Sequence, residues 1–230
     1  MTKPTLGNPQ NTIEVLQKYG FSFQKKFGQN FLIDTRVLDK IIASANITKD
    51  DMVLEIGPGI GTMTQYLACA ARKVVAVEID KALIPILEDT LSAYDNVTVI
   101  NEDVLKVDIN QLAEEYNGGK PIKVVANLPY YITTPIIMNF LENEIPVSSL
   151  TVMVQKEAAQ RLCADMGTRK CGAVTAAVSY YAKAEKLFSV ERGSFIPSPN
   201  VDSAVIRLTV HRNPPVAAND EKMLFSVIRA

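Results

Sequence analysis

The sequence predicts an α/β domain with a mostly parallel, seven-stranded sheet and a C-terminal antiparallel strand. From residue 52 onward, short apolar runs alternate with helical patterns, which is typical of parallel strands joined by crossover helices. The last two apolar runs have no helical pattern between them, so these strands should pair in antiparallel orientation. A chain of 230 residues can bury a full core as one domain.

The elements follow from the spacing of apolar residues along the chain. We expect a helix over 12–19 and a second over 34–45, for which Asp34 is a suitable N-cap. Further helices are expected over 61–71, 81–93, 134–142 and 156–164. Strands are expected over 52–56, 73–78, 97–100, 122–126, 150–155, 184–190 and 202–210. The stretch 172–182 fits either a helix or a strand.

The composition excludes a strongly basic nucleic-acid binder and gives no sign of a membrane protein. The net charge is −1, no apolar stretch can span a bilayer, and the N-terminus has no signal-peptide pattern. The three cysteines have no CxxC or metal-ligand spacing, which favours reduced thiols in the cytoplasm, and one histidine gives no basis for a metal site. Basic residues gather locally at 25–26, 169–170 and 183–186, so composition leaves RNA binding undecided.

A glycine-rich turn follows the first strand of the sheet. The segment 53–61 runs from an apolar strand into Gly57, Gly59 and Gly61, and a helical pattern comes next. Glycines at this place let the backbone turn sharply and approach a ligand closely. The acidic Glu55 before the glycines and the G-x-G-x-G spacing favour S-adenosylmethionine over a nicotinamide dinucleotide.

Carboxylates end the next two strands. Glu78 closes the strand over 73–78, where a carboxylate suits the paired hydroxyls of a ribose. Asp103 follows the strand over 97–100 and could accept a hydrogen bond from an adenine amine. Two acids at matching ends of consecutive strands predict a nucleoside-binding half of the sheet.

The tetrapeptide at 127–130, Asn-Leu-Pro-Tyr, follows the apolar run that ends at Ala126. It combines an amide side chain, a carbonyl that the following proline keeps out of a helix, and an aromatic ring at the end of a buried strand. These groups can hold a flat, conjugated amine. An ordinary strand-to-loop turn remains the alternative interpretation.

Seven segments, in order, resemble the small-subunit (16S) ribosomal RNA adenine N6,N6-dimethyltransferases, the family whose loss gives kasugamycin resistance in bacteria. They are 26–32, 55–61, 77–80, 102–105, 127–130, 154–157 and 195–203. The resemblance implies a Rossmann-like class I methyltransferase fold that uses S-adenosylmethionine, with residues 1–212 as the catalytic domain. Residues 213–230 would be a linker and the start of a truncated helical domain, because a helical pattern from Asp220 is incomplete at Ala230.

The resemblance also implies a role for each matching residue. Those expected to bind the cofactor are Asn30, Leu32, Gly57, Gly59, Glu78, Ile79, Asp103, Val104 and Asn127. Glu78 would hold the ribose hydroxyls and Asp103 would bind the adenine amine of the cofactor. Asn127 and the Leu128 carbonyl would accept hydrogen bonds from the target adenine amine, while Tyr130 and Phe195 would stack on its ring. The resemblance also implies that the protein is a cytoplasmic monomer, and that its partner is 16S rRNA in a pre-30S particle.

Three alternatives stay open at this point. The macrolide-resistance methylases share most of these motifs but modify large-subunit rRNA, and the segment 201–205 favours the small-subunit group. Protein glutamine methyltransferases carry a related tetrapeptide, but the segment 29–32 is not expected of them. The chain could also act mainly as an RNA-binding factor in ribosome assembly.

Overall fold

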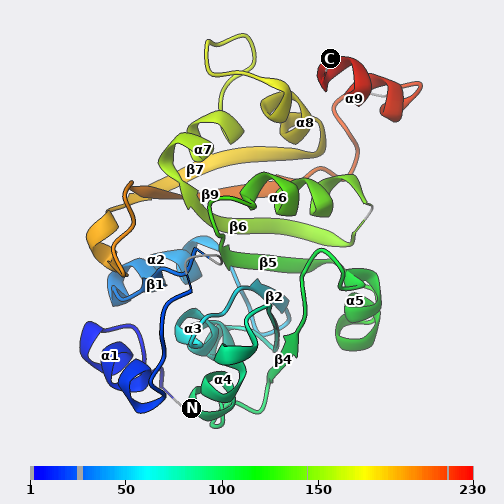
Figure 1. Cartoon of the computed structure of the whole chain (residues 1–230). Helices are drawn as coiled ribbons and strands as arrows, with labels where there is room; N and C mark the ends of the chain where they lie inside the picture. The colour runs from blue at the N-terminus through cyan, green and yellow to red at the C-terminus, as the bar shows by residue number, and fades with distance from the viewer. Residues whose placement is uncertain (1–2, 25–27, 144, 217, 230) are drawn as a thin grey trace.

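A seven-stranded sheet in the order β4-β3-β2-β5-β6-β9-β7 forms the centre of the fold in a computed structural model, which describes residues 3–24, 28–143, 145–216 and 218–229 (Figure 1). Its strands are β2 (Met52–Ile56), β3 (Lys73–Glu78), β4 (Val97–Asn101), β5 (Ile122–Asn127), β6 (Val147–Gln155), β7 (Ala182–Val190) and β9 (Ser203–Val210). Strands β2 to β6 are parallel, and β9 lies antiparallel between β6 and β7. The predicted fold class is confirmed.

A second, two-stranded antiparallel sheet joins β1 (Phe31–Leu32) to β8 (Phe195–Ile196). The described helices are α1 (Pro9–Lys18), α2 (Thr35–Ser44), α3 (Thr62–Ala70), α4 (Ile84–Thr90), α5 (Ile109–Asn117), α6 (Thr133–Glu142), α7 (Lys156–Leu162), α8 (Ala173–Tyr181) and α9 (Glu221–Arg229). Among the described residues, the short 3₁₀ turn η2 (Lys81–Leu83) precedes α4, and η3 (Arg192–Ser194) precedes β8. Among the described residues, no helix is long and apolar enough to cross a bilayer.

Hydrophobic cores lie on both faces of the sheet. Side chains alternate along each strand, so Val124 packs with the helices α5 to α8 whereas Val125 packs with α1 to α4. Strands that are buried on both faces read as continuous apolar runs. For this reason the predicted bounds of β2 and β3 are confirmed, and the other predicted strands begin and end within about three residues of their observed bounds.

Three predictions about helices need revision. The ambiguous stretch 172–182 is helix α8, and the helix predicted over 81–93 is the turn η2 followed by the shorter α4. Helix α5 was not predicted, although its signals are present in the sequence. The Asp108 side chain caps it by accepting from the Gln111 N–H at 3.0 Å, and Gly118 ends it in a left-handed conformation. The basic pair at 25–26 and the last residue, Ala230, lie outside the described residues.

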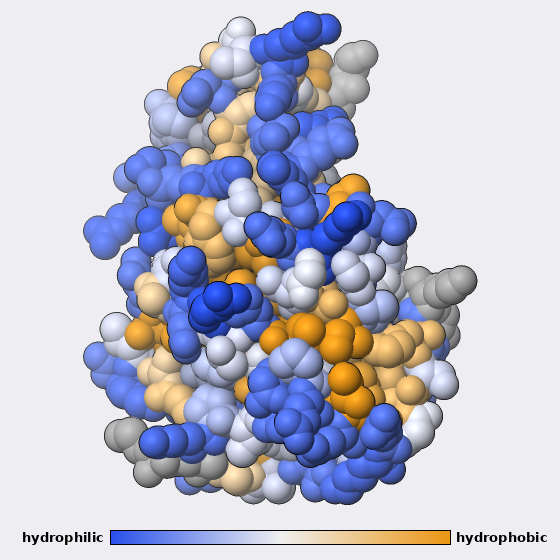
Figure 2. Space-filling view, turned by 90° about the vertical axis from the view of Figure 1, so that its left-hand side faces the viewer, coloured by the Kyte–Doolittle hydropathy of each residue, from blue (hydrophilic) through white to orange (hydrophobic). Residues whose placement is uncertain are grey.

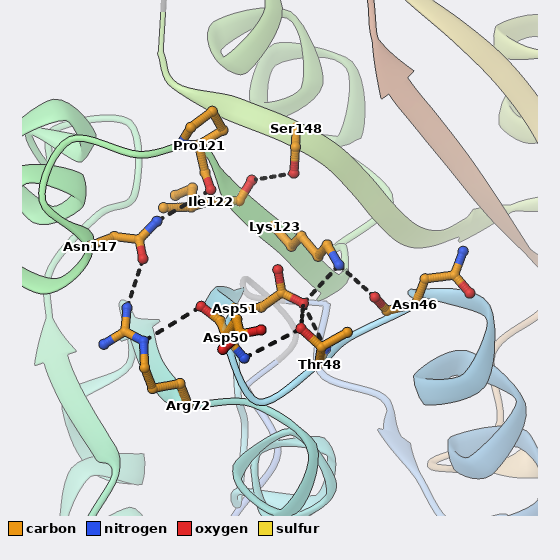
Figure 3. A network of polar contacts seen from close by, with 10 residues as sticks. All are labelled: Asn46, Thr48, Asp50, Asp51, Arg72, Asn117, Pro121, Ile122, Lys123 and Ser148. Carbon is orange, nitrogen blue, oxygen red and sulfur yellow. Dashed lines mark hydrogen bonds and ion pairs between the residues drawn. The ribbon is translucent and has the colours of Figure 1, made fainter.

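A polar network fixes the amino ends of the central strands (Figure 3). Lys123 on β5 pairs with Asp51, which precedes β2, at 2.8 Å. Arg72, which precedes β3, donates to the Asn117 side chain at 2.7 Å and to the Tyr116 carbonyl. These contacts stabilise the edge of the sheet at which the parallel strands begin. The pocket described below lies at the other edge, where these strands end.

Candidate active site

A pocket opens at the carboxyl ends of β2, β3 and β5, where open α/β sheets bind their ligands. It contains about 1160 Å³ of empty space, part of it open to solvent. Of the twelve residues predicted for the site, eleven line this pocket and Phe195 does not. Figure 2 shows the side of the molecule on which β1 lies, with exposed hydrophobic surface across its middle and hydrophilic residues around it.

The three glycines after β2 adopt positive φ angles but face different surroundings. A side chain at Gly57 would meet no atom within 4 Å, so this backbone is open toward the pocket. A Cβ at Gly59 would lie 2.8 Å from the Phe31 ring, and one at Gly61 would lie 3.0 Å from the Thr90 hydroxyl. Gly59 also lines the pocket, and the position of the Phe31 ring explains why a residue with a side chain would not fit there.

Glu78 is held in place by the backbone around it. Its carboxylate accepts from the Gly59 N–H at 3.2 Å and from the Asp80 N–H at 2.8 Å, one bond on each oxygen. The side chain is buried, and burial raises its pKa to about 7. Each oxygen keeps acceptor capacity for a ligand hydroxyl, which is the geometry expected of a ribose site.

Asp103 and the residues beside it form the next part of the wall. The Asp103 Oδ1 atom accepts from the Leu105 N–H at 3.0 Å, which fixes the carboxylate in the loop after β4. Val104 is buried, and Ile79 is 48% exposed although it also lines the pocket. Two aliphatic side chains on the wall of one pocket suit contact with the flat faces of a ring.

Glu55 on β2 also lines the pocket. It was not among the binding residues that we predicted from the sequence. The side chain has no exposed surface, and neither carboxyl oxygen has a hydrogen-bond partner among the described residues. Burial raises its pKa to about 8, the Thr64 hydroxyl nearby opposes this rise, and the charge of Glu78 adds to it. Glu55 is therefore protonated at neutral pH.

The amide of Asn127 has a fixed orientation. Its Nδ2 atom donates to the Asn30 carbonyl at 3.0 Å, and Asn30 in turn donates to the Gly28 carbonyl at 2.9 Å. The amide oxygen of Asn127 is thus left as the acceptor that faces the pocket. The next residue, Leu128, donates its N–H to the Met153 carbonyl at 3.1 Å, and its own carbonyl accepts no hydrogen bond from a described residue. Two consecutive residues of the pocket wall therefore each carry an acceptor oxygen that has no donor among the described residues.

Aromatic rings stand at the mouth of the pocket. Tyr130 is half-buried, and its hydroxyl lies 2.8 Å from the Ser203 hydroxyl on β9. Tyr131 is 62% exposed and lies beside Gly28. Neither the Ser203 contact nor Tyr131 was part of the predicted site. The Ser203 contact could not be predicted from local sequence, because it joins residues that are far apart in the chain.

Phe195 lies outside the set of residues that line the pocket. Its backbone pairs with Leu32 between β8 and β1, and both side chains are buried in the core with α1 to α4. Leu32 reaches the pocket wall, whereas Phe195 is 3% exposed and does not. Stacking by Phe195 stays a prediction that this arrangement does not support. No group of three or more potential metal ligands occurs among the described residues.

The fold and the pocket define a Rossmann-like methyltransferase domain. The sheet order, the glycine turn, the acidic strand ends and the amide at the end of β5 together carry this assignment. The chain belongs to the ribosomal RNA adenine dimethylase family, whose model matches residues 20–230.

Relatives support the same family. The chain is 66% identical over 226 residues to the ribosomal RNA small subunit methyltransferase A of Lachnoclostridium phytofermentans, a match covering 98% of the chain and 78% of that protein. It is 55% identical to the protein of the same name from Geobacillus thermodenitrificans, with 98% of the chain and 77% of that protein covered. The segment 26–32 and the tetrapeptide at 127–130 thus carried a resemblance that is confirmed at the level of the family.

Solved structures confirm the fold. A dimethyladenosine transferase from Plasmodium falciparum is 32% identical with a TM-score of 0.69, and the match covers 79% of this chain and 63% of that one. The 23S rRNA methyltransferase ErmE is 31% identical with a TM-score of 0.73, and the match covers 87% and 78%. Since the chain is similar to both structures to a comparable degree, the fold alone does not separate a dimethyladenosine transferase from a 23S rRNA methyltransferase.

Proposed function

We propose that this protein transfers methyl groups from S-adenosylmethionine to the N6 amines of two adjacent adenosines near the 3′ end of 16S rRNA. The observation that carries the chemistry is the pair of acceptors at Asn127 and Leu128, which line the pocket and have no donor among the described residues. The high identity to proteins named small-subunit methyltransferases supports small-subunit rRNA as the substrate over large-subunit rRNA. We further propose a cytoplasmic monomer that acts on a pre-30S particle, with 1–212 as its catalytic domain and 213–230 as a linker that enters a helical domain.

The pocket residues fit this cofactor. Glu78 offers acceptor oxygens for ribose hydroxyls, Gly57 leaves open space beside the turn, and Asp103 offers an acceptor for an adenine amine between Ile79 and Val104. Asn30 and Leu32 also line the pocket, and the amino-acid end would lie against them. When bound, S-adenosylmethionine supplies a methyl group that its sulfonium has already activated.

Asn127 and Leu128 make the target nitrogen reactive. The amine of adenine is conjugated with its ring and is a poor nucleophile. Two acceptors that take both amine protons favour a tetrahedral nitrogen with a free lone pair, and they bind more strongly as positive charge develops on that nitrogen. The Asn30 contact preorganises the amide, so little reorganisation is needed at the moment of reaction. Tyr130 would hold the base once it has left its stack.

The test is the Asn127→Ala variant in single-turnover methylation of unmethylated 30S subunits at saturating cofactor. We expect the rate to fall by about a hundredfold, the scale of one lost preorganised group at the reacting centre. Cofactor affinity measured by calorimetry should stay within about threefold, because Asn127 mainly serves the target amine. Asn139→Ala, a change in an asparagine on the partly exposed part of α6, is the matched control.

Mass spectrometry of the rRNA gives the substrate. Two dimethylated adenosines in 16S rRNA, and none in 50S subunits treated in parallel, would support the proposal. A wild-type rate for Asn127→Ala would exclude the role of the amide, and methylation of 23S rRNA alone would exclude the small-subunit assignment.

A further inference from the structure

We propose that Ser203 is a positioning residue, which holds the ring of Tyr130 in the orientation that receives the target base. The inference deepens the proposed function and rests on it, because Tyr130 is the proposed stacking platform. Its basis is the 2.8 Å contact between the two hydroxyls, which joins residues separated by 73 positions in the sequence. Stacking alone needs only the face of the ring, so the hydroxyl contact calls for a separate explanation.

The two partners differ in how firmly the fold holds them. Ser203 is fully buried as the first residue of β9, and its backbone pairs with Gln155 on β6 and with Val190 on β7. Tyr130 lies in the loop between β5 and α6, directly after Pro129. The contact therefore ties a ring on a loop to a strand that is fixed from both sides.

The surroundings favour a neutral phenol, and either hydroxyl can donate in the contact with Ser203. Burial raises the pKa of Tyr130, the Ser203 hydroxyl opposes the rise, and the charge of Asp202 adds to it. Asp202 is itself held at the start of β9, where its side chain accepts from the Arg192 N–H at 3.3 Å and its carbonyl accepts from the Lys156 N–H at 3.0 Å. Tyr130 thus keeps its proton at neutral pH.

A fixed ring captures a base more easily than a mobile one. A tyrosine without a partner for its hydroxyl samples more side-chain rotations, and this freedom is lost when a base stacks on it. Ser203 limits the rotation before the base arrives, which reduces the entropic cost of capture. The expected effect is therefore on the capture and alignment of RNA rather than on cofactor binding.

A double-mutant cycle of Ser203→Ala and Tyr130→Phe tests the coupling. We expect each single change to lower kcat/KM for 30S subunits by about threefold to tenfold, the scale of one lost neutral hydrogen bond. The double variant should be no worse than the poorer single one, and cofactor affinity should stay within about twofold. Ser203→Thr, which keeps a hydroxyl, should recover most of the loss.

Ser148→Ala is the matched control. It removes a serine hydroxyl bond to the Ile122 carbonyl, 3.1 Å long, at the opposite edge of the sheet. This variant should lose stability to a similar degree while keeping kcat/KM, so comparison with it separates positioning from a general loss of stability.

Two results would overturn the role of Ser203: a wild-type kcat/KM for Ser203→Ala, or single losses that multiply in the double variant. Tyr130→Ala distinguishes this outcome from failure of the proposed function. If Tyr130→Ala is impaired while Ser203→Ala is not, only the positioning role fails. If Tyr130→Ala methylates at the wild-type rate, the stacking role of Tyr130 fails as well.

Discussion

Replacement of Glu55 by glutamine should remove a large pH dependence of stability. Glu55 is fully buried without a hydrogen-bond partner among the described residues, and its pKa is about 8 against an ordinary value of 4.5. Between these two pH values the folded protein binds a proton that the unfolded chain has released. The free energy of unfolding therefore falls as the pH rises through this interval. At about 1.4 kcal/mol per pH unit, the fall amounts to at most about 5 kcal/mol.

The assay is urea denaturation of wild type and Glu55→Gln at pH 5, 6, 7 and 8. The side chain of the variant cannot ionise, so the stability of the wild type relative to the variant should decrease by several kcal/mol from pH 5 to pH 8. Glu78 titrates in both proteins, so its own contribution largely cancels, and what remains of it in the comparison is its charge interaction with Glu55. Glu88→Gln on α4, where the side chain is exposed, should follow the wild type.

The same variant has a functional readout. Since Glu55 of the wild type is already neutral at pH 7, Glu55→Gln should bind S-adenosylmethionine within about threefold of the wild-type affinity. Identical pH dependence in the two proteins would refute the reasoning about burial. A tenfold loss of affinity at pH 7 would show that the site needs the charged carboxylate.

Three further predictions concern the glycine turn, the ribose site and the sheet edge. Gly59→Ala should destabilise the fold more than Gly57→Ala in urea titrations, because the two share a backbone strain of about 1–2 kcal/mol but only the former meets the Phe31 ring; equal losses would argue against the clash. Cofactor affinity measured by calorimetry should weaken below about pH 7, by up to about tenfold per pH unit, because Glu78 becomes protonated there. The Glu78→Gln variant should not show this pH dependence. Lys123→Met should cost about 1–3 kcal/mol at pH 7. Burial raises the pKa of its partner Asp51, but hydrogen bonds from Lys123 and Thr48 bring this pKa below its ordinary value of 3.8, so the cost should shrink as the pH falls through that lowered pKa. A constant cost at all pH values would exclude the ion pair as its origin.

The sequence predicted what depends on short segments. The apolar runs of β2 and β3 specify strands because both of their faces are buried. Glu78, Asp103 and Asn127 could be placed in one pocket because parallel strands bring their carboxyl ends to one edge.

What depends on distant packing could not be predicted in this way. The Phe31 ring against Gly59 and the Ser203 hydroxyl on Tyr130 join segments that only the folded chain brings together. Phe195 has the residue type for stacking, but its pairing with Leu32 directs it into the core. Helix α5 is a different case, since its cap at Asp108 was present in the sequence.

The direction of β9 sets the order in which the site is completed as the chain is made. Because β9 is antiparallel to its neighbours, its first residue, and not its last, meets the edge at which the parallel strands end. The nucleoside half of the pocket is encoded entirely before residue 129, whereas the partner of Tyr130 follows 73 residues after it. A nascent chain therefore contains every residue of its cofactor wall well before it contains the serine that fixes the ring. The ability to hold a base in place is the later of the two to emerge.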